Sequence, residues 1–136
     1  MGANGDHEFV VDASYTLAFL LPDERNEQVV STFRRYAEHE MHLVSIPLLP
    51  LEVGNGLKLA VARKRIEPVT AFELVRSFLH HRIPLVEIGL EQIWETAERE
   101  QLTMYDAAYL VLARQRNLPL LSFDKHLLRF AYQGAI

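Results

Sequence analysis

Two short, largely apolar runs in this chain end directly before an aspartate, and this pairing strongly limits how the chain can fold. The first run, Glu8–Val11, leads into Asp12, and the second, Leu118–Phe123, leads into Asp124. Runs of this length and composition are typical of buried strands. Because the carboxyl ends of parallel strands meet at the sheet edge where α/β proteins bind ligands, we expect both carboxylates at a binding edge.

Segments with helical spacing separate the predicted strands. The four strands that we predict are Glu8–Val11, Leu43–Ile46, Pro84–Ile88 and Leu118–Ser122. The predicted helices cover residues 15–21, 23–40, 51–62, 68–80, 91–101, 103–116 and 125–132. Strands alternating with helices predict a parallel sheet with helices on both faces. The expected fold class is therefore α/β, a three-layer α/β/α domain with a central parallel sheet flanked by helices.

The length and composition of the chain fit one globular domain. The chain has 136 residues, of which 49% are hydrophobic and 24% are charged, as in ordinary soluble proteins. It contains no cysteine, which excludes disulfides and Cys-based zinc or redox sites and fits a cytoplasmic location. No apolar run approaches the roughly 18–20 residues of a membrane span. We expect residues 1–7 to be a disordered leader or an expression remnant, and residues 8–136 to form a single domain.

Four acids stand at or near predicted helix starts: Asp12, Glu52, Asp106 and Asp124. Each has a purely structural explanation, because a cap contributes about 1 kcal/mol and an acid near a helix start about 0.3–1 kcal/mol. Thr103 and Asp106 also fit a capping-box pattern. Glu52 and Asp106, however, stand among apolar neighbours. Four carboxylates gathered at one strand edge would repel one another and raise their pKa values until a cation arrived. All-oxygen ligation suits Mg²⁺ or Mn²⁺.

The sequence around each of these acids resembles a motif of the PIN-domain family, and specifically of VapC-type toxin ribonucleases. The four segments are Val10–Ser14, Ile46–Asn55, Tyr105–Leu110 and Leu118–Leu127. Any one of them is short, but all four in order and with suitable separations are specific. The chain departs from the family pattern where Ser122 replaces the usual threonine, a change that keeps the hydroxyl. The last strand that such proteins commonly add is expected to be short or missing.

The resemblance implies a metal-dependent endoribonuclease that hydrolyses RNA phosphodiester bonds and serves as the toxin of a type II toxin–antitoxin (VapBC) pair. It implies the catalytic residues Asp12, Glu52, Asp106 and Asp124. Mg²⁺ (or Mn²⁺) would be bound by the three aspartates and by Glu52, the latter directly or through water. Ser14 and Ser122 would hold the carboxylates in place. One metal ion or two remains an open choice.

The resemblance also implies three partners: RNA, a second copy of the chain in a homodimer, and a small antitoxin protein bound in an apolar groove. The RNA-contact candidates are Lys58, Arg63, Lys64, Arg65, Arg114, Arg116 and Lys125, although the net charge of −4 is low for a nucleic-acid binder. The apolar faces of Val29–Ala37 and Val69–Leu79 are candidates for the groove and are equally compatible with a plain core. His80–Arg82 lacks metal-ligand spacing and receives no catalytic role.

Two alternatives accompany this reading. One is a PIN-domain nuclease of RNA maturation, which a single short domain makes less favoured than a toxin. The other is a catalytically silent PIN scaffold that acts as a protein-binding module. The presence of all four acids argues against this second alternative. Phosphotransfer folds of the dehalogenase type are disfavoured, because Asp12–Ser14 lacks their second aspartate.

Overall fold

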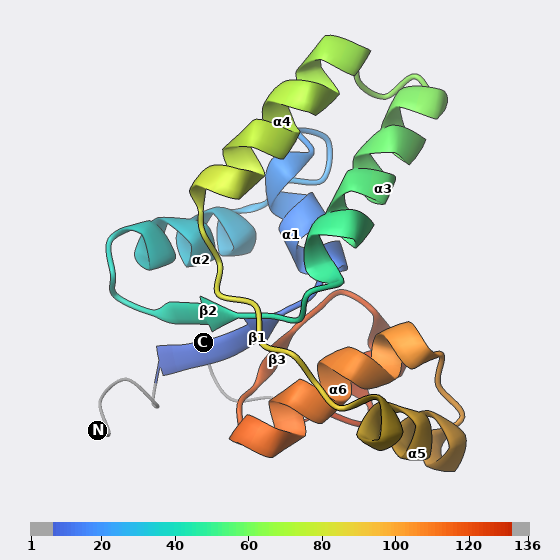
Figure 1. Cartoon of the computed structure of the whole chain (residues 1–136). Coiled ribbons are helices and arrows are strands. Elements are labelled where there is room, and N and C mark those ends of the chain that lie inside the picture. Colours follow the sequence, from blue (N-terminus) through green and yellow to red (C-terminus); the bar gives the residue numbers. More distant parts are fainter. Residues whose placement is uncertain (1–6, 132–136) are drawn as a thin grey trace.

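Three parallel strands form an open sheet at the centre of the molecule (Figure 1). The structure, a computed structural model, describes residues 7–131. The strand order is β2-β1-β3, with β1 at Glu8–Val11, β2 at His42–Val44 and β3 at Leu120–Leu121. Both neighbours pair with β1 in parallel. The carboxyl ends of β1 and β3 therefore point the same way, as the positions of the two aspartates predicted.

Helices cover both faces of this sheet. In chain order they are α1 (Ala13–Leu20), α2 (Glu27–Ala37), α3 (Leu49–Ala62), α4 (Pro68–His80), α5 (Leu90–Glu100), α6 (Met104–Arg116) and α7 (Lys125–Leu128). Figure 1 shows α1 to α4 on one side of the sheet and α5 and α6 on the other. The predicted three-layer α/β/α fold with a central parallel sheet is confirmed.

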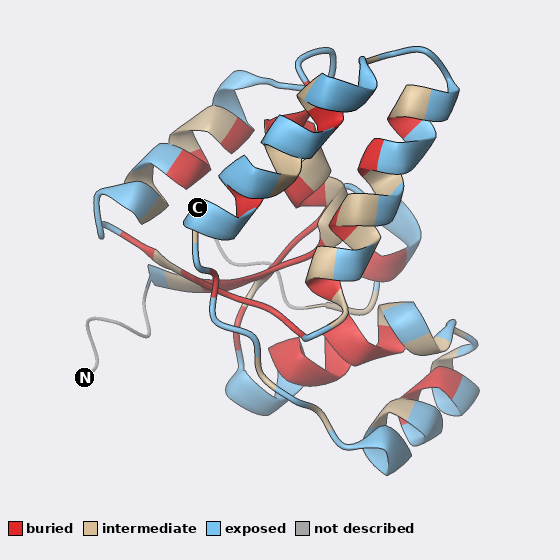
Figure 2. Cartoon of the chain, turned by 45° about the horizontal axis from the view of Figure 1, so that its top comes forward, coloured by how far each residue is buried: buried red, intermediate tan, exposed pale blue. Residues whose placement is uncertain are grey.

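Strand β1 supplies side chains to both cores because successive residues of a strand point to opposite faces. Phe9 and Val11 pack with α1 to α4. Val10 packs on the other face with Leu110 and Leu112 of α6. A strand buried on both faces reads as a continuous apolar run, which is why the first strand is readable from sequence. Figure 2 shows that α6 is also buried over most of its length.

Local signals explain where several helices begin and end. The side chain of Asn26 accepts a hydrogen bond from the Val29 N–H at the start of α2. Proline stands in the first turn of α3 and of α4, where its missing N–H costs nothing. Helices α5 and α6 end on Gln101 and Asn117, both left-handed with φ of 56°. Because the turn after α5 is short, α6 follows directly and packs against it.

The predicted third strand, Pro84–Ile88, is wrong as a strand. Its pairing is a single parallel bridge between Ser45 and Leu85, held by hydrogen bonds from the Ser45 N–H to the Pro84 carbonyl (2.9 Å) and from the Val86 N–H to the Ser45 carbonyl (2.7 Å). The segment lies at the outer edge of the sheet, next to the end of β2, so it can pair on one side only. Pro84 also has no N–H to donate to a neighbouring strand. A short edge of this kind is a common way to end a sheet.

Other predicted boundaries shift by a few residues. The predicted fourth strand, residues 118–122, is shorter in the structure and covers only Leu120–Leu121. The predicted helix over residues 23–40 begins only at Glu27. The final helix ends at Leu128 rather than at residue 132. The predicted leader, residues 1–7, lies outside the described residues apart from His7. The further strand at the end of the chain, which the family resemblance predicts to be short or missing, also falls outside them. Across residues 7–131, every helix is too short or too polar to cross a lipid bilayer.

Ser45 connects the ends of two strands beside the candidate site, and its replacement gives a first prediction. Its hydroxyl is fully buried and donates to the Val11 carbonyl at 2.7 Å. We expect Ser45→Ala to lower the free energy of unfolding by about 1–3 kcal/mol, because a buried carbonyl loses a partner. Urea unfolding measures this, with the exposed Ser77→Ala on α4 as the control, expected to change stability by less than about 0.5 kcal/mol. Equal effects of the two changes would contradict this role for Ser45.

Candidate functional site

Asp12 stands between β1 and α1 and caps the helix. Its backbone N–H donates to the Leu121 carbonyl at 3.1 Å, which aligns the ends of β1 and β3. Its carboxylate Oδ1 accepts from the Tyr15 N–H at 3.0 Å and from the Ser14 hydroxyl at 2.8 Å. The residue is only 5% exposed. The predicted helix cap is therefore real, and it fixes a nearly buried carboxylate at the binding edge of the sheet.

The surroundings of Asp12 make its charged form costly. Burial raises the pKa of its carboxyl group from 3.8 to about 6. Hydrogen bonding by Ser122, the Tyr15 N–H and Ser14 partly offsets burial, and the nearby charge of Glu52 raises the pKa further. A cation at this position would stabilise the ionised carboxylate.

Glu52 reaches the same region from the first turn of α3. Its Oε1 accepts a hydrogen bond of 2.7 Å from the hydroxyl of Tyr109, which is buried on α6. Burial raises the pKa of Glu52, the Tyr109 hydroxyl lowers it, and the charge of Asp106 raises it again. This hydrogen bond joins helices from the two opposite faces of the sheet and orients the Glu52 carboxylate.

The close packing of α1 on α3 helps to bring Glu52 toward Asp12. A Cβ atom on Gly56 would lie 2.3 Å from Cδ1 of Leu17. Because real Cβ contacts are never this short, a larger residue would force Leu17 or one of the helices to move. Glycine at this position leaves room for the Leu17 side chain between the two helices that carry Asp12 and Glu52 at their starts.

Asp106 and Asp124 are close enough for their charges to interact. Asp106 is half-buried in the first turn of α6, and its N–H donates to the Thr103 hydroxyl at 3.1 Å. Burial raises the pKa of Asp106, the charge of Asp124 raises it further, and His126 lowers it. Asp124 caps α7 by accepting from the His126 N–H at 3.0 Å and the Leu127 N–H at 3.2 Å.

Two serine hydroxyls connect the first acid to the last. The hydroxyl oxygens of Ser14 and Ser122 lie 3.4 Å apart. Ser122 accepts from the Asp124 N–H at 2.9 Å, and Ser14 donates to Asp12. Ser14 and Ser122 therefore lie between the first and the last acid, and their role in holding the carboxylates stays a prediction.

The four acids thus form a connected series, here called the acidic site: Asp12, Glu52, Asp106 and Asp124. The charge of Asp124 raises the pKa of Asp106, that of Asp106 raises the pKa of Glu52, and that of Glu52 raises the pKa of Asp12. Within residues 7–131, no three His, Asp or Glu side chains are arranged so that together they could hold a metal ion. Mg²⁺ typically takes one or two protein carboxylates plus waters and substrate phosphate. The donor set fits such an ion if the remaining acids act through water.

The candidate RNA-contact residues divide into two groups. Three are engaged with acids: Arg65 with Asp23 and Glu24, Arg114 with Glu100, and Arg116 with Glu8. Glu8 begins β1, so Arg116 lies at the sheet edge opposite the acidic site. In the described part of the chain, Lys58, Arg63, Lys64 and Lys125 are exposed and form no ion pair.

A hollow of about 510 Å³ opens beside Ser14, and we call it the flanking hollow. Its lining includes Asn26, Gly56, Arg63, Arg65 and Phe123. Two aromatic residues close to the four acids have no role in the sequence analysis. Tyr109 stands inside the third motif and Phe123 directly before Asp124, so the signal was their adjacency to predicted acids.

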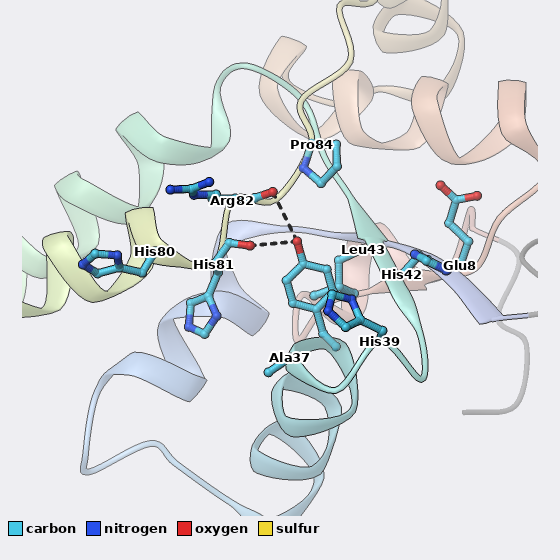
Figure 3. A pocket seen from close by; sticks show the side chains of 10 residues that line it. Glu8, Ala37, His39, His42, Leu43, His80, His81, Arg82 and Pro84 are labelled. Atoms are coloured by element: carbon cyan, nitrogen blue, oxygen red, sulfur yellow. Dashed lines mark hydrogen bonds between the residues drawn. The ribbon is translucent and has the colours of Figure 1, made fainter.

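A separate cavity of about 610 Å³ lies at the amino end of β1 and β2 (Figure 3). Its lining includes His39, His42, His80 and His81, and none of the four acids. The Tyr36 hydroxyl donates to the carbonyls of His81 (2.8 Å) and Arg82 (3.2 Å). Burial lowers the pKa of His81, and its ring packs edge-on against Phe33. His81 therefore acts as a packing residue.

The two apolar faces considered for partner binding differ in exposure. On α2, Val29 and Phe33 are buried in the core. On α4, Val69, Phe72 and Leu79 are exposed. A hollow of about 270 Å³ between α3 and α4 is lined by Phe72 and other apolar residues. The surface available to a partner is therefore the one on α4.

Comparison with known proteins gives the family. The PIN domain model matches residues 9–132. Ribonuclease VapC9 of Mycobacterium tuberculosis is 33% identical over 121 residues, which are 87% of this chain and 87% of that protein. The chain belongs to the PIN-domain family, among its VapC-type members. Each of the four sequence motifs falls inside the matched part of this PIN domain.

Solved structures show the same PIN fold. The crystal structure of PAE2754 from Pyrobaculum aerophilum has a TM-score of 0.77 and 23% identity, and the match covers 98% of this chain and 86% of that one. Mycobacterium tuberculosis VapC20, described as a sarcin-ricin loop cleaving toxin, has a TM-score of 0.65 and 16% identity. That match covers 93% of this chain and 98% of VapC20.

The raised pKa of Asp12 predicts how stability depends on pH in this PIN domain when divalent metal is absent. The folded state holds its proton more tightly than the unfolded chain, so wild-type stability should fall as the pH rises from 3.8 to about 6. Asp12→Asn keeps a capping oxygen but carries no charge. We expect the variant to be more stable than wild type at pH 8, by up to about 3 kcal/mol.

Urea unfolding in EDTA at pH 8 and at pH 4.5 measures this difference, which should shrink at the lower pH. Glu98→Gln, at an exposed position on α5, is the control and should match wild type at both values. A variant that is less stable than wild type at pH 8 would show that burial does not disfavour the Asp12 charge.

Proposed function

We propose that this PIN domain is an endoribonuclease that hydrolyses RNA phosphodiester bonds at the acidic site and acts as the toxin of a type II toxin–antitoxin pair. The observation that carries the proposal is the nearly buried Asp12, coupled through Glu52 and Asp106 to Asp124 at the carboxyl edge of a parallel sheet. The VapC relative named a ribonuclease and the VapC20 neighbour described as a toxin support this chemistry.

The proposed reaction depends on Mg²⁺ or Mn²⁺. A divalent ion would lower the pKa of a bound water and neutralise charge that develops on the phosphate. Asp12, Asp106 and Asp124 would hold it, two of them at most directly, in keeping with the absence of a three-ligand group among residues 7–131. The raised pKa values of Asp12 and Asp106 support this assignment, because each carboxylate lacks enough positive charge nearby.

Glu52 would orient and deprotonate the attacking water. Its pKa is raised by burial and by Asp106, and a raised value suits a carboxylate to accept a proton near neutral pH. Tyr109 would act as its positioning residue through the 2.7 Å hydrogen bond. Ser14 and Ser122 would keep Asp12 and Asp124 at a fixed separation through their hydroxyls.

The proposed protein partners are a small antitoxin and a second copy of this chain, with the cytoplasm as the location. We place the antitoxin segment on α4, because Val69, Phe72 and Leu79 are exposed there beside an apolar hollow. Exposed apolar side chains gathered on one helix are typical of a surface that binds a partner.

Cleavage of RNA tests the proposed function. We expect wild type to cleave single-stranded RNA in the presence of Mg²⁺ or Mn²⁺ and to lose cleavage in EDTA. Asp12→Asn and Asp106→Asn should each lower the rate by about 100-fold or more, as loss of a charge-stabilising group commonly does. Product formation on a labelled oligonucleotide gives the rates.

The control for lost charge is Glu98→Gln, an exposed acid on α5 that is expected to retain the wild-type rate. Circular dichroism establishes that each variant is folded. Folded Asp12→Asn protein that cleaves as fast as wild type would overturn the assignment of the acidic site. Absence of cleavage by wild type freed of any co-purified protein would favour the silent-scaffold alternative.

A further inference from the structure

The ring of Phe123 is held at the surface of the acidic site. The residue is 44% exposed although it stands between Ser122 and Asp124. Its N–H donates to the Ser14 hydroxyl at 2.9 Å, and the next N–H, that of Asp124, donates to Ser122. The backbone of Phe123 is thus tied to the same hydroxyls that connect the first and last acids.

One face of the Phe123 ring is fixed by stacking on Tyr15. The two ring centroids lie 5.1 Å apart with an interplanar angle of 10°. Tyr15 is itself buried, and its hydroxyl lies 2.7 Å from that of Thr32 on α2. Because the supporting ring cannot move without breaking this contact, Phe123 presents a preorganised aromatic surface. The ring remains 44% exposed in this fixed position, so it is accessible to a ligand.

The exposed side of this ring lines the flanking hollow together with groups that suit nucleic acid. Arg63 also lines it and forms no ion pair with any described residue, whereas Arg65 is held by Asp23 and Glu24. Asn26 uses its carbonyl oxygen as a helix cap, which leaves its amide N–H groups to donate. An aromatic face, an unpaired guanidinium and an amide in one hollow are groups that bind single-stranded nucleic acid.

We propose that Phe123 stacks on the nucleobase next to the scissile phosphate and that Arg63 binds a neighbouring backbone phosphate. The proposal rests on the proposed RNA hydrolysis at the acidic site. It makes Phe123 a substrate-positioning residue and requires an unpaired base at that position, because a paired base is covered by its neighbours in the helix. Every nucleobase has a stacking face, so the contact selects unpaired structure rather than sequence.

The test compares Phe123→Leu with Phe123→Tyr on an unstructured RNA oligonucleotide that is cleaved at one bond. We expect Phe123→Leu to lower kcat/KM about 10–100-fold, the usual loss for a base-stacking contact. Phe123→Tyr keeps the ring and should stay within about threefold of wild type. Melting temperatures separate lost stacking on RNA from lost folding, and the tyrosine variant preserves the contact with Tyr15.

An abasic nucleotide beside the cleaved bond makes the test specific to stacking. Wild type should lose a similar factor on the abasic RNA, and Phe123→Leu should lose nothing further, because the two changes remove the same contact. Losses that multiply would overturn the base-stacking role. Full activity of Phe123→Leu would also overturn the base-stacking role. In that case, loss of cleavage in Asp12→Asn would still support the proposed nuclease activity. A wild type without any cleavage would overturn both proposals.

The contribution of Arg63 has its own readout in the salt dependence of RNA binding. Arg63→Gln should reduce the slope of log K against log salt by about one, because one phosphate contact is lost. Arg34→Gln, an exposed arginine on α2 without an ion pair among residues 7–131, is the matched control. Equal slopes for the two variants would overturn the assignment of Arg63.

Discussion

The arrangement of the site depends on a single buried carboxylate, that of Asp12. Asp12 directly follows the central strand and accepts the first hydrogen bonds of α1. It lies at the sheet edge between the four helices on one face and α6 on the other. Burial raises its pKa to about 6, so its charge is unfavourable at neutral pH in the absence of a cation. The hydrogen bond from the Tyr15 N–H that caps α1 lowers this pKa, but burial outweighs it. This imbalance is the physical argument for a ligand at the site.

Capping and metal binding are compatible uses of the same residues. Asp12 and Asp124 each accept their backbone hydrogen bonds on one oxygen, Oδ1. A carboxylate oriented in this way can offer its second oxygen to water or a cation. Asp106 differs, because Thr103 caps α6 and leaves the Asp106 carboxylate without a capping role. The choice between cap and ligand that the sequence posed for each acid is therefore not exclusive.

The features that sequence predicted are those set by local pattern. Both aspartates that follow apolar runs lie at the ends of adjacent parallel strands, and the α/β class follows from the alternation of elements. The apolar run Pro84–Ile88 predicts a third strand, but its position at the edge of the sheet leaves it a single bridge. The contact between Tyr109 and Glu52 joins residues 57 positions apart, and the pairing of Arg65 with Asp23 joins residues 42 apart. No periodicity in the sequence encodes such long-range contacts. The first orients the Glu52 carboxylate, and the second holds the Arg65 side chain in an ion pair.

Binding of a divalent ion by the four acids is the central claim, and thermal unfolding during a Mn²⁺ titration at pH 8 tests it most directly. A bound ion stabilises the folded state by RT ln(1 + [Mn²⁺]/Kd), about 2.7 kcal/mol at one hundred times Kd. The melting temperature of wild type should therefore rise with the logarithm of the Mn²⁺ concentration. Asp12→Asn and Asp106→Asn should respond weakly, and Glu98→Gln should respond like wild type. A melting temperature that stays constant up to millimolar Mn²⁺, or one that rises equally in the Asp12 variant, would contradict a shared cation site.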